Sequence, residues 1–585
     1  MASGARAIIY LLLTCLLVPV AAGCAPTQPA SPGASGAPTS AAATSVPAAA
    51  QPATREPLPT QGPLPTAATT AVAAAKPTAA PAGKQGGSIV YATTSDAVTF
   101  HPYLRTDATS GSYQGLVYAG SLMNYDPKTL EKIPDAAKSW TVSEDRLTYT
   151  FTLRDDLLWS DGKPITSADY KWTFDQASKP ENKYPYLSNF EGIVSYEAPD
   201  PKTIVVKLDE ALVVGIEKAD AVVPLPKHIW ENLDWSDPQK NPQILAPTVG
   251  SGPYLLKEWQ KDNRAVFTAN DKYYDGRPLI DTFTYRIVPS SEIAYQMLKT
   301  GEVDIANFTP DNYEDAKKLP NATVYEWWPA AASWMYLGFN QRRETYKDPE
   351  VRRALSYAID RNAIAEHILN NLARPTYSAF TPSSWVYNPD VPRYDVDVEK
   401  AKSMLDAAGW KVGDGGVRQK DGKPLTMRII YGPNTSKTFE RVATVVQQSW
   451  GDVGVKVEVQ GMEWGTYLSQ LKSEPFDWDV NVGVWGSTIE PHWMNQIWRE
   501  DAIPSLNAGG YVNKRVEELF DQGVREFDRD KRKAIYQEIQ TILSTDAPYV
   551  FLTFNLSYIG INNRIGGIEP TPVGIGYNRE HWYIK

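Results

Sequence analysis

The chain has 585 residues, of which 42% are hydrophobic and 11% aromatic, and these values are typical of globular proteins with large buried cores. Lysine and arginine number 58 against 68 aspartate and glutamate residues, which gives a formal net charge of −10. This acidic balance argues against nucleic acid and other polyanions as partners, and against a basic membrane-surface protein.

Residues 1–24 have the pattern of an export signal. Arg6 supplies a positive charge, an apolar run follows from Ile8 to Val20, and small residues lead to Cys24. The run is too short to span a membrane. The end of this segment resembles a bacterial lipobox, although Ala21 stands where that motif usually has leucine. The resemblance implies that Cys24 is diacylated as the mature N-terminus, which predicts an exported protein with a lipid anchor in the cell membrane, facing the periplasm or the cell exterior.

The two cysteines of the chain are Cys15, inside the apolar run, and Cys24. The sequence after the signal therefore offers no disulfide, thiolate metal site or cysteine nucleophile. Residues 25–87 are rich in Ala, Pro, Thr and Ser and nearly free of charge, so they bury too little apolar surface to fold. We interpret this stretch as an extended, disordered tether, and a cleaved pro-segment is the alternative.

The first part of the folded region has the pattern of a β-rich module. Residues 89–92 form an apolar strand, and residues 147–153 alternate between large apolar side chains and threonine, as in a half-buried antiparallel strand. Thr166 and Asp169 have the spacing of a capping box in front of a helix. Residues 255–260 and 265–269 flank a polar turn and predict a β-hairpin.

The second part alternates strands and helices. A strand is expected at 333–340, and Asp348-Pro349 begins a helix, with Asp348 as N-cap. Expected strands at 427–431, 455–459 and 480–484 alternate with expected helices at about 437–450 and 464–471, an order that predicts a mostly parallel, doubly wound sheet. Two helices, about 512–527 and 529–543, precede an apolar strand at 549–554.

Several stretches carry a recognisable pattern. Residues 118–166 include YDPKT, SWTVSED, TYTFTLR and WSDGKPIT, residues 249–254 read VGSGPY, residues 347–361 read KDPEVRRALSYAIDR, and residues 397–410 read DVEKAKSMLDAAGW. Together they resemble the extracellular solute-binding proteins of ABC importers, in the peptide/nickel/opine class, family five. The resemblance runs from about residue 86 to the C-terminus.

The resemblance implies an α/β protein with the type II periplasmic-binding-protein fold (cluster C), in which two α/β lobes are joined by a hinge. Lobe I is expected at 88–330 plus 555–585, with a β-rich inserted subdomain at about 126–215, and lobe II at 331–554. The chain then crosses between the lobes near residues 329–331 and 553–555. Ligand binding is expected to close the lobes.

The ligand is expected in the cleft between the lobes. In peptide-binding relatives, the loop after the tryptophan at position 485 carries an acid that pairs with the peptide amino group. Here that loop is one residue shorter, with Thr488 near the expected aspartate, so either Glu490 takes the role or the ligand has no amine there. The expected ligand-binding residues are Tyr113, Trp334, Met335, Trp385, Trp485, Thr488 and Glu490.

Peptide is the expected cargo by family resemblance. The tryptophans also suit stacking on sugar faces, which keeps an oligosaccharide-binding member of the family as an alternative, and nickel or a metallophore is a third. His492 lies near the candidate loop but has no partners at metal-ligand spacing, so no metal and no cofactor are expected. The expected partners are a membrane permease and its ATPase subunits, and the protein is expected to be a monomer and not an enzyme.

Two other classes of function remain alternatives from the sequence. An exported glycoside hydrolase would use paired carboxylates in a tryptophan-rich cleft, and acidic residues are too plentiful to exclude such a pair. A lipoprotein adhesin or scaffold is the second. No nucleophile motif, metal motif or phosphate loop appears in the sequence.

Overall fold

The structure is a computed structural model, and it describes residues 83–432 and 437–585. The predicted signal peptide at 1–24, the lipidation of Cys24 and all but the last residues of the predicted tether at 25–87 lie outside the described residues. Within the described part, no helix is long and apolar enough to cross a membrane.

A seven-stranded sheet has the order β12-β22-β11-β1-β10-β9-β8. Its central strand β1 pairs in parallel with β10 and β11, while β8, β9 and β10 pair antiparallel, as do β11, β22 and β12. The predicted hairpin at 255–269 is confirmed as β8 and β9. The strands are β1 (Ser88–Thr93), β8 (Tyr254–Gln260), β9 (Arg264–Ala269), β10 (Thr282–Ile287), β11 (Ile305–Ala306), β12 (Ala322–Trp327) and β22 (Ser557–Asn562).

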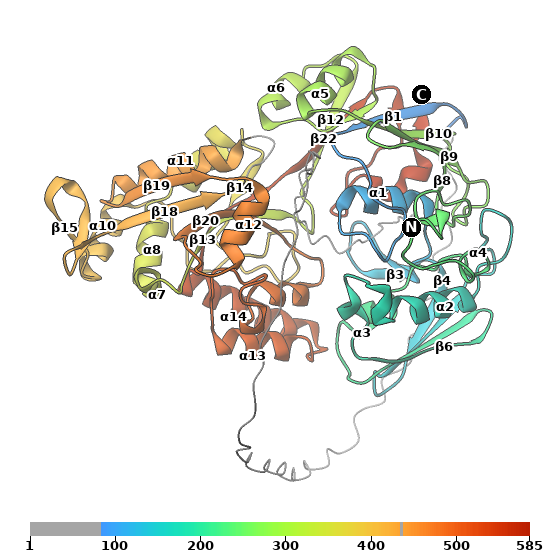
Figure 1. The fold of residues 1–585 in the computed structure, drawn as a ribbon, viewed down its shortest axis with the longest axis horizontal. Helices are drawn as coiled ribbons and strands as arrows, with labels where there is room; N and C mark the ends of the chain where they lie inside the picture. Colours follow the sequence, from blue (N-terminus) through green and yellow to red (C-terminus); the bar gives the residue numbers. More distant parts are fainter. Residues whose placement is uncertain (1–82, 433–436) are drawn as a thin grey trace, which may run out of the picture. The chain divides into compact units, whose positions relative to one another are not determined.

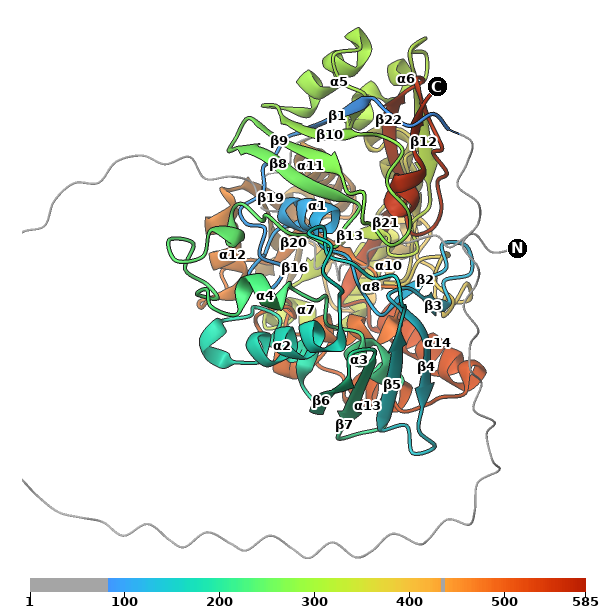
Figure 2. The ribbon, with the colours of Figure 1, turned by 90° about the vertical axis from the view of Figure 1, so that its right-hand side faces the viewer.

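A four-stranded antiparallel sheet has the order β4-β5-β7-β6, and its strands lie side by side in Figure 2. In β5 (Thr148–Leu153) Tyr149, Phe151 and Leu153 are buried while the threonines between them are partly exposed, so the predicted alternation is confirmed. The predicted capping box begins α2 (Ser167–Ala177), where the Thr166 amide donates to Asp169 Oδ2 across 2.9 Å. The other strands are β4 (Ala137–Val142), β6 (Ile193–Asp200) and β7 (Thr203–Leu208).

A six-stranded sheet has the order β14-β21-β13-β20-β18-β19. β18 pairs in parallel with β19 and β20, as the strand–helix–strand order of the sequence predicts. The prediction of a mostly parallel sheet is wrong for the other half, because β13 pairs antiparallel with β20 and β21, and β14 with β21. The strands are β13 (Ser333–Phe339), β14 (Ala373–Pro375), β18 (Thr426–Tyr431), β19 (Lys456–Gly461), β20 (Val480–Gly486) and β21 (Tyr549–Asn555).

Two hydrophobic cores cover the six-stranded sheet. One contains Leu337, Phe339 and side chains of α8, α10 and α11, and Figure 1 shows α11 beside β18 and β19. The other contains Trp334, Tyr336 and side chains of α13 and α14. The predicted N-cap of α8 is confirmed, since Asp348 Oδ1 accepts from the Glu350 amide across 2.8 Å. The longer helices of this part are α8 (Pro349–Tyr357), α10 (Val398–Ala407), α11 (Thr438–Gly451), α12 (Trp464–Lys472), α13 (Lys514–Gly523) and α14 (Arg529–Asp546).

The chain passes from the seven-stranded to the six-stranded sheet between the end of β12 at Trp327 and the start of β13 at Ser333. It returns between the end of β21 at Asn555 and the start of β22 at Ser557. At this point Asn555 Nδ2 lies 3.4 Å from Ser333 Oγ, so both connections leave the same end of the six-stranded sheet. Helices α1 (Ala108–Val117), α3 (Gly215–Ala219) and α5 (Ser291–Thr300) belong to the remaining part of the chain.

Candidate functional site

Aromatic residues on β13 and β20 form the centre of the candidate site. Trp334 pairs directly with Trp485 in the sheet register, and the rings of Tyr336 and Trp485 are parallel within 5° at a centroid distance of 6.4 Å. Trp334 is fully buried, whereas Trp485 is partly exposed. Trp485 therefore offers ring surface at this site and Trp334 supports it from the core.

The predicted residue Met335 lies on the opposite face of the same strand. Successive side chains of a strand point to opposite faces. Met335 accordingly packs with Leu337 and Phe339 in the core under α8 and α11, while Trp334 packs in the core under α13 and α14. The structure therefore does not bring Met335 together with the two tryptophans.

Buried polar atoms without a hydrogen-bond partner among the described residues gather at the end of the sheet where the chain crosses. They are Ser487 Oγ, directly after β20, Thr553 Oγ1 in β21 and Asn555 Oδ1 at the end of β21. Ser487 is tied to this end because its amide donates to the Ala332 carbonyl across 2.8 Å. Buried polar groups are nearly always paired, so these atoms have unused hydrogen-bonding capacity. No sequence motif marks them, and sequence reasoning missed them.

Glu490 has both carboxylate oxygens engaged within the chain. Its Oε2 accepts from Arg532 Nη1 across 3.0 Å, and its Oε1 accepts from Arg532 Nη2 and, across 2.8 Å, from the His492 amide. Only 10% of the Glu490 side chain and 5% of the Arg532 side chain are exposed. Thr488 lies beside it and donates through Oγ1 to the Glu490 carbonyl across 2.6 Å.

The surroundings of Glu490 have opposing effects on its pKa. Burial raises the pKa of the Glu490 carboxyl, the charge of Glu217 raises it further, and the Arg532 guanidinium lowers it. Burial also lowers the pKa of His492 to about 3, with Arg532 acting in the same direction, so this imidazole is neutral at physiological pH. The loop thus contains one compensated carboxylate and an uncharged histidine.

Trp385 joins this group through arginines of α14. The Arg532 guanidinium carbon lies 5.5 Å from the Trp385 ring centroid and that of Arg529 lies 5.1 Å from it. Trp385 is partly exposed and packs against the same core as Trp485. Arg532 therefore brings together Trp385, Thr488 and Glu490, which span 105 positions of the sequence.

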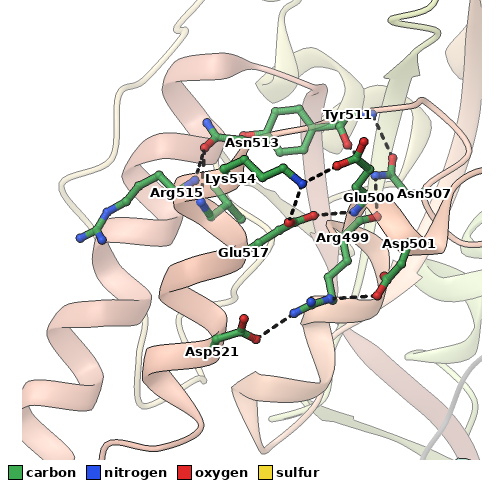
Figure 3. Close-up of polar contacts among 11 residues, drawn as sticks. Arg499, Glu500, Asp501, Asn507, Tyr511, Asn513, Lys514, Arg515, Glu517 and Asp521 are labelled. Atoms are coloured by element: carbon green, nitrogen blue, oxygen red, sulfur yellow. Dashed lines mark hydrogen bonds and ion pairs between the residues drawn. The ribbon is translucent and has the colours of Figure 1, made fainter. Parts of the chain in front are cut away.

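Ion pairs fix the segment that follows the loop onto α13 (Figure 3). Lys514 Nζ lies between the carboxylates of Glu500 and Glu517, the latter at 3.3 Å, and the Glu500 amide donates to Glu517 Oε1 across 2.7 Å. Arg499 Nη1 lies 2.8 Å from Asp521. Exposed pairs of this kind contribute little individually, but together they hold residues 499–502 against the helix. The candidate loop is thus anchored at its far end.

Tyr113 lies in a different part of the molecule. It is fully buried in α1, where its ring stacks on Tyr285 at 4.6 Å and contacts Phe267 edge-on at 5.5 Å. Burial raises the pKa of its phenol, and the charge of Asp96 adds to the effect. A cavity of about 50 Å³ lies beside α1, lined in part by Gly115 and Leu116, and its size suits water rather than a larger solute. The structure does not bring Tyr113 to the tryptophan site.

A second carboxylate that sequence reasoning missed meets the candidate loop from the other side. Glu217 of α3 accepts through Oε2 from Trp493 Nε1 across 3.2 Å. The Tyr125 hydroxyl donates to its Oε1, and Lys132 Nζ lies 3.7 Å from the same oxygen. No sequence signal links these residues, because Glu217 and Trp493 are 276 positions apart. Glu217 too is compensated by a cation.

Within residues 83–432 and 437–585, no group of three or more His, Cys, Asp or Glu side chains is placed to hold a metal ion. His101 is fully buried and accepts through Nδ1 from the Tyr103 amide across 3.1 Å. The candidate site therefore consists of aromatic rings and polar atoms.

Comparison with protein families gives a match over most of the folded chain. The model of the bacterial extracellular solute-binding proteins, family 5 Middle, matches residues 131–503. The oligopeptide-binding protein AppA of Bacillus subtilis (strain 168) is 29% identical over 509 residues, which are 86% of this chain and 93% of AppA. The dipeptide-binding protein of Escherichia coli (strain K12) is 27% identical over 534 residues, 84% of this chain and 94% of that protein.

Solved structures agree with these matches. AppA from B. subtilis in complex with a nonapeptide superposes with a TM-score of 0.72 at 28% identity, covering 86% of this chain and 100% of AppA. NikZ from Campylobacter jejuni in complex with Ni(L-His) has a TM-score of 0.72 at 25% identity, covering 85% of this chain and 99% of NikZ. These likenesses confirm the predicted type II periplasmic-binding-protein fold. The matched proteins are solute-binding proteins, so the alternative of an exported glycoside hydrolase is wrong.

Proposed function

Because the chain belongs to the bacterial extracellular solute-binding proteins, family 5, and therefore captures a solute for an ABC importer, we propose that its cargo is a peptide. We further propose that the peptide is gripped by closure of two lobes and is delivered to a membrane permease, whose ATPase subunits supply the energy. The relatives described as oligopeptide- and dipeptide-binding proteins, each matched over more than four-fifths of this chain, support peptide as the cargo.

One observation supports the proposed location of the site. The partly exposed ring of Trp485 lies parallel to the Tyr336 ring, and Ser487, two residues further along the chain, has a buried Oγ without a hydrogen-bond partner among the described residues. An aromatic face buries apolar area, and the polar atoms gain hydrogen bonds when a solute supplies the missing partners. Both features suit an amphipathic ligand such as a peptide. The ligand-binding residues of the proposal are Trp485, Trp385 and Thr488, with Ser487 added.

The proposed roles of the remaining predicted residues differ. Glu490 has its oxygens engaged by Arg532 and His492, so in this proposal it shapes the loop and does not pair with a peptide amine. Trp334 supports the site from the core. Tyr113 and Met335 stay predictions of the sequence, with no contact to the tryptophan site.

The lobes of the proposal follow the two large sheets. Lobe I comprises residues 88–330 and 555–585, with the inserted subdomain at about 126–215, and lobe II comprises residues 331–554. The two chain crossings that leave the same end of the six-stranded sheet support a hinge there. Ligand that contacts both lobes shifts the population toward the closed form.

An oligosaccharide is the second candidate cargo, and a specific observation favours it. The carboxylates near the loop, Glu490 and Glu217, are compensated by Arg532 and Lys132, which leaves neither of them to pair with an α-amine, whereas Trp485 and Trp385 both present ring surface. A nickel complex like that in the NikZ structure is the third. The proposal keeps the lipid anchor at Cys24 and a monomeric state.

Calorimetry on the full chain tests the proposal. Di- to nonapeptides and a set of oligosaccharides are titrated separately, and the recovered solute is analysed by mass spectrometry. We expect one-to-one binding of peptides, which are recovered intact. Binding of oligosaccharides alone would overturn the peptide assignment, and conversion of the solute would overturn the binding role.

A variant locates the site. Trp485→Ala removes the exposed ring and is expected to weaken binding by about tenfold or more, since one buried aromatic contact contributes about that much. Trp464→Ala is the matched control, because Trp464 is also partly exposed but packs in a separate core with Tyr467 and Leu471. Equal affinities of the two variants would remove Trp485 from the site.

A further inference from the structure

The turn between α13 and α14 contacts the part of the chain that carries the four-stranded sheet. Arg525 Nε donates to Glu210 Oε1 across 2.6 Å, and the Val213 amide donates to the Val524 carbonyl across 2.8 Å. Glu210 and Val213 follow β7, while Val524 and Arg525 follow α13. These contacts join two regions more than 300 residues apart in the sequence.

Two weaker contacts lie in the same place. The Arg146 guanidinium carbon lies 3.9 Å from the centroid of the Phe527 ring, and Arg529 Nη1 lies 3.9 Å from Glu131 Oε1. Arg146 is in the turn between β4 and β5, which lies at the same end of the sheet as the end of β7, because Thr148 pairs with Lys207. We call the contacts of Glu131, Arg146, Glu210 and Val213 with Val524, Arg525, Phe527 and Arg529 the clasp.

Arg525, the clasp arginine that pairs with Glu210, is also held by contacts within its own region. Arg525 Nη1 donates to the Asp521 carbonyl across 2.8 Å, which directs the guanidinium along the end of α13. The turn itself is fixed, since Arg532 Nε donates to the Gly523 carbonyl across 2.8 Å and Asp528 caps α14. A preordered side chain loses less conformational entropy on pairing than a free one. The Arg525–Glu210 ion pair therefore costs less conformational entropy than a pair between two freely moving side chains.

We propose that the clasp is an ionic latch that holds the two lobes together in the absence of ligand and sets the population of the closed form. The inference rests on the proposed function in that the lobes are those that grip the solute. Every clasp contact joins lobe I, through its inserted subdomain, to lobe II, and none includes a residue of the proposed ligand site. Opening the lobes breaks all of these contacts.

The latch has a measurable consequence for binding. When only the closed form binds with full affinity, the apparent dissociation constant varies inversely with the closed fraction. An exposed ion pair changes an equilibrium by about two- to fivefold, and the effect falls as salt screens it. The clasp therefore makes solute affinity dependent on ionic strength even for an uncharged solute.

Single-molecule Förster resonance energy transfer (FRET) on the ligand-free protein measures the closed population and so tests the latch. Dyes are attached through Lys207→Cys, on the exposed side of β7, and Ser473→Cys, after α12, in the full chain carrying Cys15→Ser and Cys24→Ser. We expect a closed population at about 0.05 M salt that declines at about 0.5 M salt. Arg525→Gln is expected to lower the closed-to-open ratio by about two- to fivefold at low salt.

Matched variants separate the latch from a general effect of charge. Arg515→Gln removes an equally exposed arginine of α13 whose partners, Glu518 and Glu538, lie in the same helix pair, so the ratio should stay at that of the parent. The exchange Glu210→Arg with Arg525→Glu is expected to restore the closed population. An Arg525→Gln variant that behaves like the parent, or an Arg515→Gln variant that opens equally, overturns the latch. Failure of the proposed function is distinguishable, because it would show as absent peptide binding while the ligand-free populations still respond to Arg525→Gln.

Discussion

Glu490 and Arg532 form a two-pronged ion pair in which the two side chains are 10% and 5% exposed. The pair joins the loop after β20 to α14, so it fixes the segment that also carries Thr488. Removing one member of a buried pair leaves an uncompensated charge, which costs far more than removing both.

Arg532→Met is therefore expected to lower the free energy of unfolding by about 3 kcal/mol at neutral pH. The deficit should shrink as pH falls and Glu490 becomes protonated, and Glu490→Gln combined with Arg532→Met should recover much of it. Arg515→Met, which affects an exposed arginine, should change the stability by less than about 0.5 kcal/mol. Urea unfolding at two pH values measures all of these, and an Arg532→Met variant as stable as the parent would contradict the prediction.

Buried neutral histidines predict a loss of stability in acid. Burial lowers the pKa of both His101 and His492 to about 3, below the ordinary value of 6.5. The unfolded chain therefore binds more protons between these values, and stability falls as pH drops below about 6.5. The expected loss is about 2 kcal/mol for each histidine between pH 7.5 and pH 5.

Substitution of each histidine isolates its share of this loss. His101→Gln should lower the stability at both pH values but reduce its decline between them, and His492→Gln should do the same. His367→Gln, at an exposed position, should keep the slope of the parent. Equal slopes in all variants, measured by chemical unfolding, would show that neither buried imidazole is responsible.

Asp220 is expected to change the stability with pH in the opposite direction to the histidines. Desolvation by burial raises the pKa of this carboxyl to about 7, although Lys132 and the amides of Leu122 and Met123, which donate to its Oδ1, oppose the rise. The folded state therefore binds more protons than the unfolded state between about pH 4 and pH 7, so this group lowers stability as pH rises through that window.

Asp220→Asn keeps an oxygen for both amides and removes the titration. Its stability relative to the parent should increase by about 2 to 4 kcal/mol from pH 4.5 to pH 8. Asp175→Asn is the control, because Asp175 is an exposed residue that pairs with Lys171 on the surface of α2. A relative stability of Asp220→Asn that does not depend on pH would contradict the assignment.

Position 483 in β20 must be glycine because the Tyr336 ring, which lies parallel to Trp485, leaves no room for a side chain. A Cβ at this position would lie 2.4 Å from Tyr336 Cζ and 2.5 Å from its hydroxyl oxygen. Gly483→Ala should therefore displace the Tyr336 ring, lower the stability by about 1 to 3 kcal/mol and weaken solute binding. Gly451→Ala, where no atom lies within 4 Å, should raise stability by about 0.5 to 1 kcal/mol as expected in a helix. Thermal unfolding and calorimetry measure both effects.

Local features were predictable from the sequence because neighbouring residues determine them. The alternation in β5, the hairpin of β8 and β9 and the caps at Thr166 and Asp348 all depend on positions a few residues apart. The antiparallel pairing of β13 with β21 was not predictable, since those strands are more than 200 residues apart and their pairing is set by the packing of both cores.

The candidate site was predictable in part. Their residue type indicates Trp485 and Trp385, and both are partly exposed in the structure. The sequence did not indicate that Glu490 is paired with Arg532 or that Glu217 reaches Trp493, because both contacts depend on elements far apart in the chain. The unpaired atoms of Ser487 and Asn555 depend on the tertiary packing around the ends of β20 and β21, which no local pattern indicates.

The position of β22 has a consequence for biosynthesis. This strand lies between β11 and β12, which have no direct pairing with each other, and it is the last of the seven strands along the chain. A nascent polypeptide that lacks residues 557–562 cannot join β12 to the rest of that sheet, whereas all six strands of the other sheet are already synthesised. The region between Ser333 and Asn555 is thus able to fold first, and the seven-stranded sheet is completed only when synthesis is almost finished.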